Sequence, residues 1–154
     1  MLKVNRKVEY ALIGLRHMHS KPREDLTTVR EICERYGTPF DPVAHVMRIL
    51  NAQGLVKSEQ GAHGGYRLQG DIRGMNLGQL IEMIEGRLAL VDCVREDKCG
   101  CGIKEQCNIV NPMQEMNNRL VEFLKSVPLA EIVFMDAQIM SGYAGMQQTS
   151  PAAS

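Results

Sequence analysis

The sequence predicts a mainly α-helical fold with a small β wing and a long helix near the C-terminus. Glycine and proline breaks divide the first third of the 154-residue chain into three segments of helical periodicity. Two short runs of β-forming residues then flank a loop at 60–65 that contains three glycines. Farther along, apolar residues recur at steps of three and four between 113 and 127, which indicates an amphipathic helix.

The first helix is predicted over residues 5–19, where apolar side chains recur at helical spacing. A polar break at 21–25 ends this segment. Charged residues interrupt the apolar ones from the start of the chain, unlike in a signal peptide, and no apolar run is long enough for a membrane helix. A cytoplasmic protein is therefore expected.

The second predicted helix is short and runs to Tyr36, with Gly37 as its stop signal. Thr27 or Thr28 can cap its start. Glu31 stands three residues after Thr28 and completes a capping-box pattern, in which the glutamate side chain returns to the N–H of the cap.

A third helix is predicted through Ala52, with Thr38 as its cap and Pro39 at its first position. Proline is tolerated there because its missing N–H would have no helical partner. Two short helices joined by a tight turn at Gly37 have the proportions of a helix-turn-helix.

Two short strands are predicted next, at Leu55–Ser58 and Tyr66–Leu68. A hairpin directly after a helix-turn-helix is a wing. Residues 1–86 are therefore expected to form one winged helix-turn-helix domain.

Asn76 and Gln79 offer a capping box for a further helix, which is expected to end at Gly86. The rest of the chain divides into a cysteine-rich loop at 87–110, a dimerisation helix with a C-terminal segment at 111–140, and a polar, disordered tail at 141–154.

The net charge of zero hides an asymmetry between the two halves. Residues 1–70 carry 11 Lys and Arg against 7 Asp and Glu, a charge of +4, whereas residues 71–154 carry 7 against 11, a charge of −4. A basic half beside an acidic half fits a module that faces nucleic acid and a separate sensing or pairing half. The helix at 111–127 has an apolar stripe that must be buried on its own domain or on a second copy.

Four of the five cysteines fall within fifteen residues, at Cys93, Cys99, Cys101 and Cys107. Their spacing, C-x5-C-x-C-x5-C, lets three or four thiolates converge on one centre, and thiolates suit zinc or iron–sulfur clusters. Structural zinc sites usually use C-x2-C pairs, and the close pair here, Cys99-Gly100-Cys101, is too tight for that knuckle. From the residues alone, zinc, thiol redox chemistry and an iron–sulfur cluster all stay open.

Five segments follow one another in a characteristic order: VEYALIGL, VREICERYG, GLVKSEQGAHGGYRL, MNLGQLIEMIEG and then the clustered cysteines. In this order the chain resembles the Rrf family of bacterial winged-helix transcription regulators. Within that family it is similar to the IscR/NsrR/RirA branch, whose members hold an iron–sulfur cluster. The resemblance implies a homodimeric repressor that binds near-palindromic promoter DNA and responds to nitric oxide, oxygen, redox state or iron supply through its cluster.

The resemblance also implies the ligands of a cluster, with 4Fe–4S favoured over 2Fe–2S. The family normally supplies three cysteines, the last two often five residues apart, which favours Cys93, Cys101 and Cys107. A second combination uses Cys99 in place of Cys101. One branch recruits a carboxylate from the first helix of the partner subunit. The matching position here is Glu9, with Cys99 as the rival fourth ligand.

Candidate DNA contacts lie early in the third helix, which such motifs place in a major groove. Hydroxyl and basic side chains nearby are placed to contact phosphates, and the wing tip is placed to approach a minor groove. Asp41 has a plainer alternative role in capping a helix turn, and any single Lys or Arg can be a solvated surface charge. The candidates are Asp41, Ala44, His45 and Arg48 in the helix; Thr28, Lys57, Ser58 and Arg67 beside phosphates; and His63, Gly64 and Gly65 at the wing tip.

The sequence contains no nucleotide-binding glycine loop and no nucleophile–base pair, so it predicts a regulator and not an enzyme. The alternative within the same fold is a DNA-binding regulator that senses through bare cysteine thiols or zinc. Cys33, the one cysteine outside the loop, is expected to be a small buried residue of the second helix.

Overall fold

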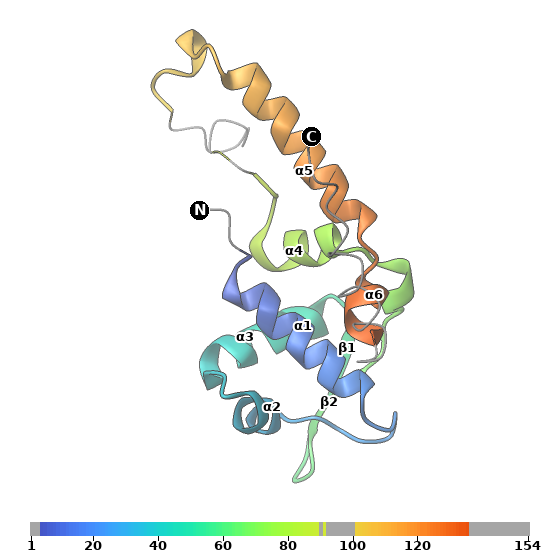
Figure 1. Cartoon of the computed structure of the whole chain (residues 1–154). Helices are drawn as coiled ribbons and strands as arrows, with labels where there is room; N and C mark the ends of the chain where they lie inside the picture. The colour runs from blue at the N-terminus through green and yellow to red at the C-terminus, as the bar shows by residue number, and fades with distance from the viewer. Residues whose placement is uncertain (1–3, 90, 92–100, 136–154) are drawn as a thin grey trace, which may run out of the picture.

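A computed structural model describes residues 4–89, 91 and 101–135 of the chain (Figure 1). Helices predominate, and the two strands described form one antiparallel pair, which confirms the predicted fold class. The predicted tail at 141–154 lies outside the described residues. The elements, with η for 3-10 helices, are α1 (Arg6–His19), α2 (Val29–Tyr36), α3 (Phe40–Ala52), β1 (Val56–Glu59), β2 (Gly65–Leu68), η1 (Ile72–Gly74), α4 (Leu77–Glu85), η3 (Lys104–Gln106), α5 (Val110–Ser126) and α6 (Leu129–Phe134).

Helix α1 passes through the centre of the winged half and packs against α3, α4 and α6. Its buried face is apolar at helical spacing, with Val8, Ala11 and Leu15 fully shielded from solvent. Asn5 caps the helix by accepting a hydrogen bond from the Lys7 N–H at 3.0 Å. The first helix predicted from periodicity is therefore confirmed.

Helix α2 begins and ends as predicted, but its capping box is only half formed. The Thr28 hydroxyl accepts from the Glu31 N–H at 3.0 Å, which identifies Thr28 as the cap. Both Glu31 side-chain oxygens bind Lys21, and one also binds His17, so the predicted return of this carboxylate to the cap N–H is wrong. Gly37 ends the helix in the left-handed region, at φ +64°.

Helix α3 starts one residue later than predicted. Pro39 is extended, with ψ 140°, and occupies the cap position, while Phe40 is the first helical residue. Thr38 therefore does not cap the helix, and its hydroxyl is buried without a hydrogen-bond partner in the described part of the chain. The reason is that the extended Pro39 separates Thr38 from the first free N–H groups of the helix.

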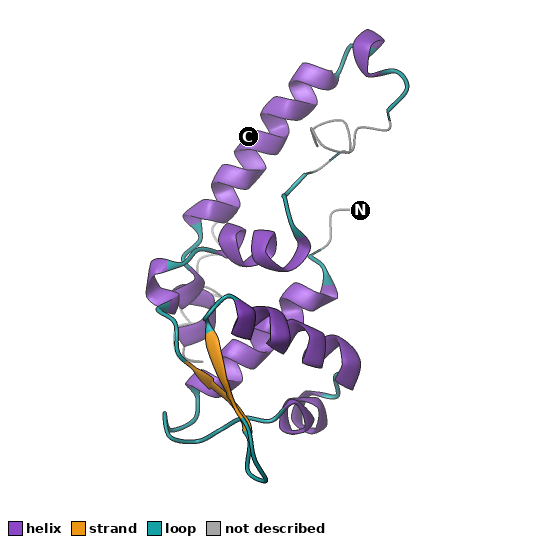
Figure 2. Cartoon of the chain, turned by 180° about the vertical axis from the view of Figure 1, so that it is seen from behind, coloured by secondary structure: helices purple, strands orange, loops and turns teal. Residues whose placement is uncertain are grey.

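The wing is a two-stranded hairpin held to the helices at both edges (Figure 2). Its register pairs Val56 with Leu68. Strand β1 is shifted by one residue from the predicted bounds, whereas β2 begins one residue earlier than predicted and ends where predicted. Thr27 exchanges two backbone hydrogen bonds of 2.8 Å with Tyr66, which ties the α1–α2 connection to β2. The Ser58 N–H donates to the Asn51 side chain at 2.8 Å and ties β1 to the end of α3.

Helix α4 has the complete capping box predicted for it, with Asn76 and Gln79 bonded reciprocally at 2.9 and 3.0 Å. The next helix, α5, begins at Val110, one residue before the predicted boundary. Its C-terminal end rests on α4, where the Leu77 N–H donates to the Val127 carbonyl at 2.9 Å. From there α5 extends away from the winged half, so its N-terminal end lies far from the wing (Figure 1). Within the described ranges, no helix is long and apolar enough to span a membrane.

Candidate DNA-binding surface and cysteine loop

The outer face of α3 carries three of the predicted contact residues. Asp41, His45 and Arg48 are exposed at the i, i+4, i+7 spacing that places them on one side of a helix. The opposite side is fully buried and holds α3 in place against α1 and α2. Ala44 is half-buried at the edge of this outer face. The arrangement leaves the three polar side chains free to reach the base edges of a groove.

Phe40 is an exposed aromatic residue at the start of α3 that the sequence pattern did not identify as a surface residue. Its side chain is 54% exposed, beside Asp41 on the first turn. An apolar ring at this place can contact the methyl group of a thymine in a major groove. The feature of the sequence that could have identified Phe40 is the preceding Pro39. A proline at the cap position places the next residue on the first turn of the helix.

The wing presents a mixed set of the predicted residues. Lys57, Ser58 and His63 are exposed. Arg67 is already ion-paired with Glu59 of the opposite strand, at 2.6 Å between the Arg67 Nη2 and the Glu59 carboxylate. A phosphate contact by Arg67 would therefore compete with an internal partner, whereas Lys57 has no such competitor among the described residues.

Gly64 and Gly65 have a structural role before any contact with DNA. A Cβ atom at Gly64 would lie 2.5 Å from the Glu59 carbonyl oxygen, and one at Gly65 would lie 2.9 Å from the Thr27 carbonyl oxygen. Both distances are too short for a side chain. Glycine is thus required for the hairpin to close and to pair with the α1–α2 connection.

A partly buried polar cluster joins α1 to α2. His17, only 3% exposed, bonds through Nε2 to Glu31 at 2.8 Å and through Nδ1 to the Tyr36 hydroxyl at 3.0 Å. The Lys21 ammonium donates to the same Glu31 carboxylate at 2.8 and 3.1 Å and to the Leu26 carbonyl at 2.9 Å. The cluster fixes α2, the first helix of the helix-turn-helix, against α1.

The Glu31 pKa is affected by its surroundings in two opposite ways. Partial burial raises the pKa, but hydrogen bonds from Lys21 and His17, together with their charges, outweigh burial and leave the pKa below its ordinary value. Glu31 therefore carries its negative charge at neutral pH. The pairing of His17 with Tyr36 could not be predicted from the sequence, because the two residues are far apart in the chain and meet only when the helices pack.

Two of the predicted ligand cysteines, Cys101 and Cys107, lie in the described residues, and Cys93 and Cys99 lie outside them. Cys101 and Cys107 are half-buried free thiols on either side of η3. The Cys101 carbonyl accepts from the Lys104 N–H, and the Cys107 N–H donates to the Lys104 carbonyl, both at 3.3 Å. This short turn is followed closely by α5, and the segment 101–107 lies at the end of the molecule remote from the wing (Figure 1).

The candidate carboxylate, Glu9, lies on α1 and pairs with Arg6 at 3.1 Å on an exposed surface. Across the ranges that the structure describes, no three His, Cys, Asp or Glu side chains gather closely enough to hold a metal. One chain thus does not bring Glu9 to the described thiols. Thiolates are suitable ligands for an iron–sulfur cluster in their chemistry, and any cluster at these two cysteines would need further ligands from the rest of the loop or from a second chain. Cys33 is half-buried on α2 and packs against the core, far from the loop in sequence.

Comparison with known proteins gives concordant results. A family model described as Rrf2, iron-dependent transcriptional regulator, matches residues 4–134. The HTH-type transcriptional regulator NsrR of Shouchella clausii is 22% identical over 125 residues, covering 81% of this chain and 84% of that protein. The HTH-type transcriptional regulator IscR of Vibrio campbellii is 24% identical over 132 residues, covering 86% and 77%. The solved structure of CymR, the global cysteine regulator of B. subtilis, superposes with a TM-score of 0.64 at 26% identity, covering 88% of this chain and 100% of CymR.

Proposed function

The chain belongs to the Rrf2 family of transcriptional regulators, and from this premise we propose that it is an iron–sulfur regulator that binds promoter DNA as a homodimer. The family consists of regulators, in agreement with the sequence prediction that the chain is not an enzyme. The observation that carries the proposal is the placement of clustered cysteines directly before α5 in a chain of this family. We assign residues 1–86 to DNA binding, 87–110 to the cluster and 111–140 to pairing.

DNA is read by the outer face of α3, with the wing beside it. Asp41, His45 and Arg48 face outward on α3, and Phe40 adds an apolar contact at its N-terminal end. The proposed contacts to phosphates or to a minor groove come from four exposed side chains, Thr28, Lys57, Ser58 and His63. Arg67 joins them only if it exchanges Glu59 for a phosphate.

Pairing uses the stripe of α5 that one chain leaves uncovered. Two side chains of the stripe are exposed, Met116 at 51% and Phe123 at 62%. Two others, Met113 and Leu120, are half-buried. All four lie on one side of α5, at steps of three and four. Burying side chains of this size contributes about 1.5–3 kcal/mol each. A second copy, which carries the same stripe, is the occupant that fits it.

The cluster would be held by Cys93, Cys107 and either Cys101 or Cys99, with 4Fe–4S favoured over 2Fe–2S. The fourth ligand would be Glu9 of the partner subunit, with Cys99 as its rival. When bound, it supplies a centre that reacts with nitric oxide or changes with redox state or iron supply. Glu9 lies on α1, which packs against the recognition helix α3. A ligand taken from α1 would therefore link the state of the loop to the placement of α3.

The deciding experiment is anaerobic purification of the full chain, followed by iron and sulfide analysis, a visible spectrum and operator binding with and without the cluster. We expect a brown protein with about four iron and four sulfide per chain. Cys107→Ser should lose the colour, whereas Cys33→Ser should keep it. Glu9→Ala should change the spectrum, whereas the matched exposed variant Glu34→Ala should not.

Two results would reject this mechanism: a colourless protein that contains zinc or no metal, and equal operator affinity with and without the cluster. Either result leaves the winged-helix regulator in place, since its family membership does not depend on the cluster.

The second candidate is a regulator of the same fold that senses through bare cysteine thiols or zinc. The structural likeness to CymR, which is named as a cysteine regulator, favours it. In that case a colourless protein would lose operator affinity on mild oxidation, and Cys101→Ser would abolish the response.

A further inference from the structure

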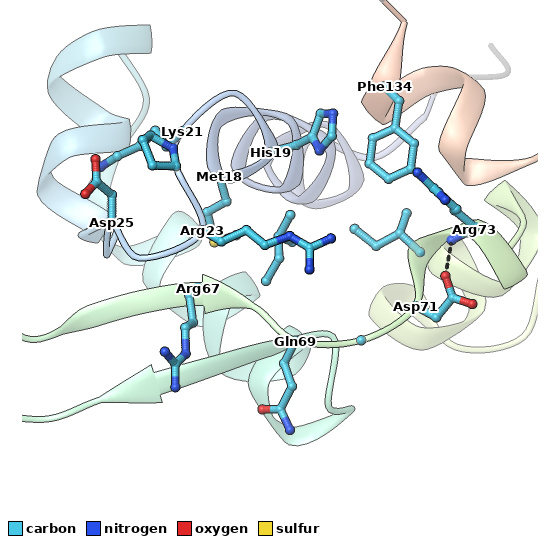
Figure 3. A pocket seen from close by; sticks show the side chains of 14 residues that line it. Met18, His19, Lys21, Arg23, Asp25, Arg67, Gln69, Asp71, Arg73 and Phe134 are labelled. Atoms are coloured by element: carbon cyan, nitrogen blue, oxygen red, sulfur yellow. Dashed lines mark hydrogen bonds between the residues drawn. The ribbon is translucent and has the colours of Figure 1, made fainter.

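A pocket of about 280 Å³ lies between the end of α1, the base of the wing and α6 (Figure 3). Its apolar floor is formed by Met18, Leu68 and Ile72, with Phe134 of α6 closing one side. The size is close to the lower end, ~300 Å³, of the range for small-molecule sites. The pocket is separate from the exposed face of α3 and from the described cysteines.

The pocket is lined by four basic side chains, Lys21, Arg23, Arg67 and Arg73, and by two acidic ones, Asp25 and Asp71. Asp25 lies beside Lys21, at the end of the pocket away from Arg73 (Figure 3). Two of the basic side chains, Lys21 and Arg67, already have a carboxylate partner, Glu31 and Glu59 respectively. Among the described residues, no carboxylate lies within ion-pair distance of Arg23 or Arg73.

The two arginines approach the pocket from opposite sides. Arg23 extends across the pocket toward Arg73, while Arg67 points away from both (Figure 3). The Arg73 guanidinium lies 5.8 Å from the centre of the Phe134 ring, so it is held at the apolar side of the pocket. Asp71 accepts a hydrogen bond from the Arg73 backbone N–H at 2.9 Å, which engages its carboxylate at the start of η1.

Phe134 is fixed in place by α1. Its ring lies 4.1 Å from the His19 ring, centre to centre. Arg16 donates to the Ile132 carbonyl at 2.9 Å and also to the Met135 carbonyl, which anchors the end of α6. The aromatic wall is thus preformed, as a binding site requires.

We propose that this pocket binds a small organic anion with an apolar or aromatic body. Its carboxylate or phosphate group lies between Arg23 and Arg73, because a guanidinium fork matches the oxygens of either group. Its body rests on Met18, Ile72 and Phe134. The pocket is a second input to the regulator, chemically unrelated to the cysteine loop.

The position of the pocket predicts the consequence of binding. An occupant touches the base of the wing through β2 and touches α6, which directly follows the pairing helix α5. A ligand that binds one arrangement of these parts more tightly shifts DNA affinity, and DNA shifts ligand affinity by the same factor. Only this coupling rests on the proposed function; occupancy of the pocket does not.

The test is calorimetric titration of the full, anaerobically purified chain with phenyl phosphate and with benzoate. We expect at least one of the two to bind with a Kd of about 1 mM or tighter. Inorganic phosphate, which lacks the apolar body, should bind at least tenfold more weakly. Arg23→Gln and Arg73→Gln should each raise the Kd at least tenfold, whereas Arg30→Gln, an exposed arginine on α2, should leave it unchanged.

The proposal is overturned if neither probe binds more tightly than inorganic phosphate, or if both arginine variants bind as the wild type does. It is also overturned if Arg23→Gln weakens operator binding and lowers its salt dependence while no probe binds, because Arg23 then serves the DNA backbone. The titration is done without DNA, and its readout does not depend on iron. A negative result would therefore reject the pocket proposal without bearing on the iron–sulfur proposal.

Discussion

Leu15 and Phe123 are both large apolar side chains on amphipathic helices, but α1 buries Leu15 completely while α5 leaves Phe123 62% exposed. The winged half also ties its parts together with polar contacts, from the His17–Glu31–Lys21 cluster to the backbone pairing of Thr27 with Tyr66. Helix α5 is attached mainly at its C-terminal end, to α4. The winged half therefore buries its apolar face within one chain, whereas α5 leaves apolar side chains exposed on the stripe for which pairing is proposed.

The largest expected effect comes from opening the core of the winged half. Leu15→Ala should lower the free energy of unfolding by about 2–5 kcal/mol, because it leaves a cavity at a fully buried site. Chemical denaturation followed by circular dichroism measures this loss. The matched variant Leu120→Ala, on half-exposed α5, should cost much less; an equal cost would contradict the contrast between the two regions.

A charge on the stripe of α5 should weaken pairing while leaving the winged half folded. Phe123→Glu should raise the dimer dissociation constant at least about 100-fold, because a buried unpaired carboxylate is costly in an interface. Sedimentation equilibrium measures this constant. Asn118→Glu adds the same charge on the opposite side of α5 and should leave pairing intact. If both variants pair as the wild type does, α5 is not the interface.

Loss of a contact on α3 should weaken operator binding more selectively than loss of one on the wing. Arg48→Ala should lower operator affinity about tenfold and relax the sequence preference, whereas Lys57→Ala should weaken all sequences alike and reduce the salt slope by about 1. Fluorescence anisotropy at several salt concentrations separates the two effects. Lys125→Ala, which removes a positive charge on α5, is the control and should change neither quantity.

The smallest effect concerns pH. Because the Glu31 pKa lies below its ordinary value of 4.5 when folded, its contribution to stability is present above that value and is lost as pH falls through the lower folded pKa. Glu31→Gln should therefore be less stable than the wild type at neutral pH and approach it in acid. Thermal unfolding at a series of pH values measures the difference. Glu34→Gln, exposed on the same helix, should run parallel to the wild type throughout.

Local signals in the sequence predicted the elements well where each signal acts within a few residues. Periodicity predicted α1, the Asn76–Gln79 box predicted the start of α4, and Gly37 predicted the end of α2. The same reasoning failed at Thr38, since whether Pro39 is the cap or the first helical residue depends on one backbone angle. It also failed for Glu31, whose side chain was expected at the Thr28 N–H but instead bonds His17 of α1 and Lys21, which follows α1.

The candidate site divides in the same manner. The outward face of α3 follows from its spacing, and the cysteine cluster is visible in the sequence, with its ligand set carried by the family resemblance. The pairing of Arg67 with Glu59 and the pocket between α1, the wing and α6 could not be predicted, because each joins residues whose distance is set only when the helices pack.

The sequence by itself determined the helical order, the wing, the cysteine cluster and the family, because helix periods, caps and glycine turns act over a few neighbouring bonds. Only the tertiary structure decided which polar side chains are engaged and which stay free. His17 lies buried between Glu31 and Tyr36, Arg23 reaches across a pocket, and Phe123 remains exposed on α5. The physical reason is that burial and ion pairing are properties of distances between elements, and those distances exist only after the core has packed.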